Sequence, residues 1–157
     1  MATQWTAGTT SGQVLTAATL NTIGATWESW TPTLSAWTQG NGTYYAKYAR
    51  VNKIVHFELQ FVVGSTSNTT ALGPIFTLPI TPISGSRWAY GFSGFALDVS
   101  VGTQVPLRAW SVGATSFYPV LSNTTTTYGD AYYISGTTPF TWATGDLLLM
   151  YGTYEAA

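Results

Sequence analysis

The chain of 157 residues suits one domain with a substantial core, but only 7% of its residues are charged, where about 25% is usual. Acid–base and metal chemistry draw on the side chains that are scarce here, and without Cys there are no disulfides, thiolate nucleophiles or zinc–thiolate sites. A net charge of −1 also provides none of the long-range field that nucleic-acid binding generally requires, so the composition argues against an enzyme, a metal or cofactor site and a nucleic-acid partner.

Residues 1–29 are predicted to form an arm ahead of the main domain. The first part is small, polar and without periodicity, and Thr16–Ile23 is predicted to be a short helix with Thr16 as its N-cap. A helix this short is marginal alone in water, so we expect Leu20 and Ile23, three apart on one face, to dock onto another surface. The first residues lack a basic leader, and no stretch approaches the ~18 apolar residues of a membrane span, so we expect synthesis in the cytoplasm without a signal peptide.

Residues 30–157 alternate with a period of two and are interrupted by Gly, Pro and Asn, which predicts an antiparallel β-sandwich, jelly-roll-like. The clearest element is a hairpin of Thr43–Val51 and Ile54–Val63, joined by a tight turn at Asn52. Alternation along the second strand predicts one face in the core and one polar face. The core face comprises Val55, Phe57, Leu59, Phe61 and Val63, and the polar face comprises His56, Glu58 and Gln60.

Further strands are expected along the rest of the chain. Leu147–Tyr151 is apolar at every position, so this strand should be central in the sheet or buried between subunits. Ser93-Gly94 is the expected position of a bulge, because the large apolar residues change parity there. The other expectations are a short edge strand near Ile75 and Thr77, a strand with Trp88, Tyr90 and Phe92 on one face and Phe95, Leu97 and Val99 on the other, and strands at Val105–Val112 and Phe117–Leu121.

Few residues are candidates for catalysis. The sole histidine, His56, is two residues from Glu58 on one strand face, and we interpret the two as an outward polar pair rather than a catalytic one, because no nucleophile or second metal ligand accompanies them. A glycan hydrolase needs only two carboxylates. Asp130 and Asp146 each follow a glycine and are predicted to cap turns. The remaining acidic residues are Glu28, Glu58, Asp98 and Glu155.

Two groups of residues are candidates for binding. Lys47, Arg50 and Lys53 alternate with tyrosines around the Asn52 turn, which we interpret as a solvated hairpin tip rather than a stacking surface. Exposed aromatic side chains are candidates for stacking on sugar rings, although they equally suit the core or a subunit interface. These candidate glycan-binding residues are Trp88, Trp110, Tyr118 and Tyr128.

Three parts of the chain together resemble a family of phage virion surface proteins, the small β-structured modules of tail fibres, minor tail proteins, head fibres and capsid decorations. Gly12–Ile23 is similar to their opening G-x-V-L-T-A-x-x-L-N phrase and leads into a W-x-P strand at Trp30–Leu34. Gly42–Val55 is similar to a recurrent G-x-Y…R-V-G-K-x-V hairpin, with Asn52 where Gly is commoner, a residue that permits the same turn. Thr138–Asp146, closing with Tyr151–Glu155, looks like their terminal hairpin.

The resemblance implies a non-enzymatic protein on a virion surface, a homotrimer with a C-terminal β-knob and an N-terminal arm that attaches it to other virion proteins. The expected attachment residues are Trp5, Leu20, Ile23 and Trp27. The scarcity of charge agrees with copies covering one another, because interface cores are depleted of charge and enriched in aromatics. Contact with a glycan of the host surface is a compatible activity. The alternatives are a free-standing carbohydrate-binding module and a glycan hydrolase built on a carboxylate pair.

Overall fold

The computed structural model describes residues 26–84, 91–122 and 131–157, and within them the protein is all-β and antiparallel, as predicted. The predicted helix at Thr16–Ile23 lies outside the described residues. In chain order the strands are β1 (Glu28–Ser29), β2 (Leu34–Ser35), β3 (Thr43–Val51), β4 (Ile54–Val62), β5 (Ile75–Thr77), β6 (Ser93–Asp98), β7 (Thr103–Val112), β8 (Ser116–Ser122), β9 (Ala131–Tyr133) and β10 (Leu147–Glu155).

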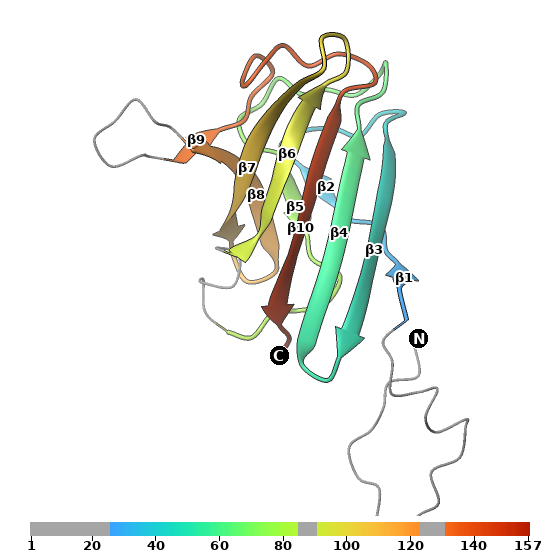
Figure 1. Cartoon of the computed structure of the whole chain (residues 1–157), viewed down its shortest axis with the longest axis vertical. Helices are drawn as coiled ribbons and strands as arrows, with labels where there is room; N and C mark the ends of the chain where they lie inside the picture. Colours follow the sequence, from blue (N-terminus) through green and yellow to red (C-terminus); the bar gives the residue numbers. More distant parts are fainter. Residues whose placement is uncertain (1–25, 85–90, 123–130) are drawn as a thin grey trace, which may run out of the picture.

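The strands form one hydrogen-bonded sheet in the order β1-β3-β4-β10-β6-β7-β8-β5-β2, and β9 pairs with β8. The sheet curls, so that β5 and β8 lie behind the front strands β4, β10 and β6 (Figure 1). Aromatic rings pack across the enclosed space. The ring centres of Phe57 on β4 and Phe117 on β8 are 5.6 Å apart, and those of Phe61 on β4 and Phe76 on β5 are 6.4 Å apart. The core therefore lies inside the curl, and each strand has an inner face toward it and an outer face away from it.

The β3–β4 hairpin confirms the strongest sequence prediction. Asn52 in its turn has a φ of 54°, the left-handed conformation that Asn tolerates at low cost. All five residues predicted for the core face of the second strand are buried, between 0% and 4% exposed. The hairpin forms because the period-two pattern and the turn residue specify the same register.

β10 is central, as predicted, because it pairs with β4 on one side and β6 on the other. Leu148 and Met150 point inward and are 0% exposed. Leu147 and Leu149 point outward and are half-buried, and the outward Tyr151 is 50% exposed. The second apolar face of this strand is thus uncovered by the described residues of its own chain.

Two predictions about single strands are wrong. β5 is not an edge strand, since β2 pairs with it on the side away from β8. There is no bulge at Ser93-Gly94, because β6 pairs residue for residue with β10 and with β7. The small Gly94 and Ala96 face inward, while Phe95 and Leu97 face outward. The change of parity in the sequence therefore marks an apolar outer face and not a break in the ladder.

Two predictions about the ends of the domain also need correction. Thr138–Asp146 forms no strand and no terminal hairpin with the last strand, because β10 uses both of its edges for β4 and β6. Instead, Trp142 of this segment packs against Trp37 at 5.1 Å and is 8% exposed, so the segment closes one part of the core. The sheet begins before residue 30, because β1 pairs with β3 through Glu28 and Ser29.

Candidate functional site

The outer face of the central strands is one candidate functional surface. The register aligns two neighbouring rows across β3, β4, β10, β6 and β7, ten positions in all, and none of them is charged. Cross-strand partners project to the same face of a sheet, so these side chains form one surface. The rows are Thr43, Val62, Leu147, Leu97 and Gln104, and beside them Tyr45, Gln60, Leu149, Phe95 and Pro106.

We name this surface, together with Tyr151, the outer apolar face. Tyr45 is 67% exposed, Tyr151 is 50% exposed, and the aliphatic and Phe side chains between them are half-buried. Large contiguous apolar surfaces are uncommon on soluble monomers, so the outer apolar face is a candidate binding surface. Fully buried interface cores show the same depletion of charge.

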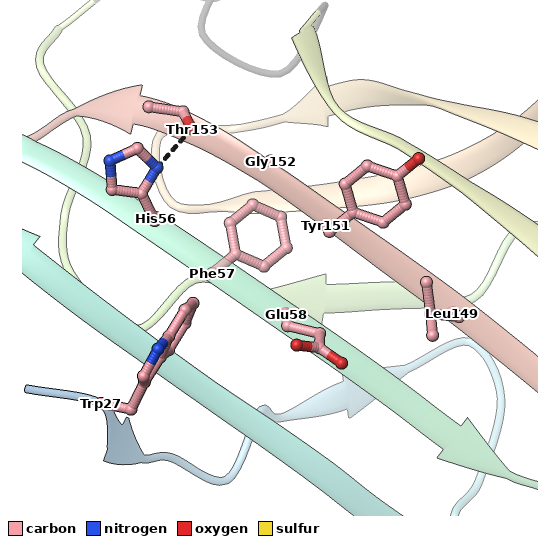
Figure 2. A pocket seen from close by; sticks show the side chains of 8 residues that line it. All are labelled: Trp27, His56, Phe57, Glu58, Leu149, Tyr151, Gly152 and Thr153. Atoms are coloured by element: carbon pink, nitrogen blue, oxygen red, sulfur yellow. Dashed lines mark hydrogen bonds between the residues drawn. The ribbon is translucent and has the colours of Figure 1, made fainter.

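A groove runs beside the outer apolar face and shares Leu149 and Tyr151 with it (Figure 2). Trp27, from the segment just before β1, and Tyr151 of β10 lie on its two sides, and polar side chains of β4 and β10 lie between them. The Nζ atom of Lys47 lies 5.0 Å from the centre of the Trp27 ring, a cation–π contact that holds the half-exposed indole against β3. Trp27, expected in the arm, therefore lies against the sheet.

The polar residues of the groove form pairs across neighbouring strands. His56 Nδ1 is hydrogen-bonded to Thr153 Oγ1 at 2.8 Å, and Glu58 forms a salt bridge with Lys47 at 3.0 Å. The predicted outward orientation of His56 and Glu58 is confirmed, but each interacts with a neighbouring strand and not with the other. Cross-strand polar pairs of this kind stabilise a sheet and fix its register.

Two other carboxylates, those of Asp146 and Glu28, have structural partners. Asp146 is 2% exposed, and its two oxygens accept hydrogen bonds from the backbone N–H groups of Ala143 at 2.7 Å and Val99 at 3.0 Å, which confirms the predicted turn cap. Glu28 accepts a 2.7 Å hydrogen bond from the Tyr48 hydroxyl, and this bond is the main cause of the raised pKa of Tyr48. Asp130 lies outside the described residues. The described part of the chain holds no group of three or more His, Cys, Asp or Glu side chains that fits a metal ion.

The basic residues of the hairpin form no continuous stacking surface. Alternation along β3 places Tyr45 and Lys47 on the outer face and Tyr44 and Tyr48 on the inner one, where they pack against the core. Arg50 donates a 2.6 Å hydrogen bond to the carbonyl oxygen of Asn52 and so fastens the turn.

A second exposed group lies on the outer face of β7, β8 and β9. Trp110 and Tyr118 are direct cross-strand partners with ring centres 6.3 Å apart and planes 26° apart. Tyr133 adds a third ring, 5.1 Å from Tyr118, with the two hydroxyl oxygens 3.2 Å apart. Trp110 is 41% exposed and Tyr133 is 46% exposed. We call these three residues the aromatic cluster.

Two of the four candidate glycan-binding residues, Trp110 and Tyr118, therefore lie together. The other two, Trp88 and Tyr128, lie outside the described residues, as do the candidate attachment residues Trp5, Leu20 and Ile23. Sequence reasoning missed Tyr133 because β9 is only three residues long and follows a polar stretch.

Comparison with protein-family models, with curated proteins and with solved structures finds no match for this chain. Within the residues that the structure describes, no helix has the length and apolar character needed to cross a bilayer.

Proposed function

We propose that this chain is a non-enzymatic structural protein of a bacteriophage virion surface, a capsid-decoration, head-fibre or tail-fibre knob. The observation that carries the proposal is the outer apolar face, ten aligned positions without a charged residue on the central strands of the sheet. The polar side chains of the groove are engaged in cross-strand pairs, so the described residues favour a role in assembly over a role in catalysis. The resemblance of the Gly12–Ile23, Gly42–Val55 and C-terminal segments to virion surface proteins supports the location.

In this proposal the occupant of the outer apolar face is a second copy of the chain. The curled sheet acts as a jelly-roll-like sandwich, and three copies pack around a threefold axis with β10 facing the neighbouring copy. Leu147, Leu149 and Phe95 supply the apolar contact, and burial of such side chains contributes roughly 25 cal/mol for each Å² removed from water. The groove beside Trp27 is covered in the same assembly, because Tyr151 borders both surfaces.

The arm attaches the trimer to other virion proteins. Because β1 belongs to the sheet, the piece available for attachment is residues 1–25, which include Trp5, Leu20 and Ile23. In this proposal the arm binds the particle and the sheet binds other copies of the chain, so truncation of the arm separates the two roles.

The location is tested by labelling the protein in intact virions of the phage that encodes it and imaging the particles. We expect label on the capsid or tail surface. A variant that lacks residues 1–25 but keeps β1 should remain oligomeric and fail to bind particles. Virions without label, or a truncated variant that still binds them, would contradict the proposal.

Adhesion to a host glycan is a second candidate activity, which suits an exposed knob. The aromatic cluster favours it, because Trp110 and Tyr133 expose nearly half of their side chains and lie on different strands from the centre of the outer apolar face. The same surface is consistent with the alternative of a carbohydrate-binding module.

A further inference from the structure

The register places a cation beside the aromatic cluster. Arg108 lies two residues before Trp110 on β7, so both side chains project from the outer face. Arg108 is opposite Val120 of β8, which is in turn opposite Tyr133 of β9. One cross-strand row therefore contains Arg108, Val120 and Tyr133, and the next row contains Trp110 and Tyr118.

Arg108 is available to a ligand. Its side chain is exposed, and among the described residues it has no carboxylate partner, whereas Lys47 is paired with Glu58 and Arg50 is bonded to its own turn. A guanidinium presents a planar fork of donors that fits a carboxylate with two parallel hydrogen bonds.

We infer that Arg108 and the aromatic cluster form a binding site for an acidic polysaccharide, with uronic acid residues as the recognised units. Trp and Tyr rings offer apolar faces for the C–H groups of a pyranose, and the Tyr133 hydroxyl, 3.2 Å from that of Tyr118, adds a polar group at the edge of the rings. Arg108 binds the carboxylate of the sugar. This inference rests on the adhesive activity proposed above and adds the class of glycan to it.

A sugar fits this surface better than a peptide. The cluster is built of side chains that stand side by side on a sheet, and the groove next to Trp27 lies beside the outer apolar face and contains none of them. Apolar peptide helices bind in concave grooves, whereas an exposed row of rings with polar tips suits a flat ring with hydroxyl groups.

The test compares two β-1,4-linked hexasaccharides, hexamannuronate and mannohexaose, which differ in having a carboxylate or a hydroxymethyl group at C6, by calorimetric titration of the full-length protein. We expect hexamannuronate to bind and mannohexaose to bind roughly tenfold more weakly, since a hydrogen bond to a charged group is lost. Added NaCl should weaken hexamannuronate binding and leave mannohexaose binding unchanged.

Variants test the contributions of Arg108 and of the aromatic cluster separately. Arg108→Gln should lower hexamannuronate affinity about tenfold without changing mannohexaose affinity. Lys53→Gln removes the same charge at the hairpin turn and should leave both affinities unchanged. Trp110→Ala should weaken both sugars and Trp110→Phe should retain most of the binding. The melting temperature of each variant identifies any that unfold, and Arg108→Gln changes only an exposed side chain.

The outcomes separate this inference from the functions proposed above. Equal affinity for the two sugars, or an Arg108→Gln variant that binds hexamannuronate normally, would overturn the assignment of an acidic glycan while keeping adhesion. Failure of both sugars to bind would overturn the assignment of this site. Neither result bears on the oligomer, which is measured independently.

Discussion

Tyr44 carries a buried hydroxyl group that has no hydrogen-bond partner among the described residues. Burial raises the pKa of Tyr44 to about 12. Removing an unpaired buried polar group relieves its desolvation cost, so Tyr44→Phe should be as stable as the native protein or more stable by about 1 kcal/mol. Urea unfolding at pH 8 measures this difference.

The same variant tests the pH dependence. The folded state holds the Tyr44 pKa above the value of about 10 expected after unfolding, so its protonated form contributes stability that is fully present below pH 10. That contribution is lost as the pH rises from about 10 to about 12. The free energy of unfolding of Tyr44→Phe should therefore fall less over this interval than that of the native protein. Tyr154→Phe is the control: its hydroxyl donates to the Ile80 carbonyl at 2.8 Å, so this variant should be less stable at pH 8 by about 1 kcal/mol. A marked destabilisation by Tyr44→Phe at pH 8 would contradict this account.

Asp146 joins two loops from a buried position. Asp146→Ala leaves the N–H groups of Ala143 and Val99 without their acceptor, and each unsatisfied buried group costs about 1–3 kcal/mol. We therefore expect a loss of at least about 2 kcal/mol in the free energy of unfolding. Asp98→Ala is the matched variant, because among the described residues the Asp98 side chain bonds only to Ser100 in its own exposed turn, and it should cost less than half as much. An equal loss in the free energy of unfolding in the two variants would contradict the larger contribution assigned to the buried hydrogen bonds of Asp146.

At the scale of elements, the pairing of β6 with β10 depends on Gly94. A Cβ atom at this position would overlap the carbonyl oxygen of Leu149 and lie 2.7 Å from Met150 Sδ. Gly94→Ala should lower the free energy of unfolding by about 1–3 kcal/mol, because overpacking forces the two strands apart. Gly91→Ala is the control, since a Cβ there meets no atom of the described residues within 4 Å, and it should change stability little. Denaturant titration of both variants checks the difference, and a Gly94→Ala variant as stable as Gly91→Ala would contradict the close approach.

The elements that the sequence predicts well are those whose local signals agree. β3 and β4 have alternation over nine residues each and a turn residue suited to a positive φ, so their hairpin follows from the sequence. β2, β5 and β9 have two or three residues each and exist only through their neighbours, which local pattern does not reveal.

The candidate surfaces were predictable in part, because local pattern indicates which residues are apolar but not which strands are neighbours. An apolar residue at every position of Leu147–Tyr151 indicates a strand with two apolar faces, and the structure places it at the centre of the sheet. The predicted bulge at Ser93-Gly94 was wrong because Phe95 and Leu97, as large apolar residues, were assumed to face the core. Trp110 and Tyr118 were both named from the sequence, but their pairing depends on strand register that only the structure provides.

At the scale of the whole molecule, the proposed assembly follows from the charge distribution. Charged residues of the described sheet, such as the Lys47–Glu58 pair, border the outer apolar face and do not enter its two rows. A second copy that covers these rows removes apolar surface from water without separating any ion pair. Leu149→Glu places a charge at the centre of the face and should disrupt the oligomer while leaving the inner core intact, since Leu149 points outward.

The solution mass of the full-length protein tests the central claim most directly. Light scattering at micromolar concentration should give about three times the chain mass of 16.8 kDa, and Leu149→Glu should give 16.8 kDa with an unchanged circular dichroism spectrum. A native protein that remains at 16.8 kDa under these conditions would contradict the claim that copies of the chain cover the outer apolar face.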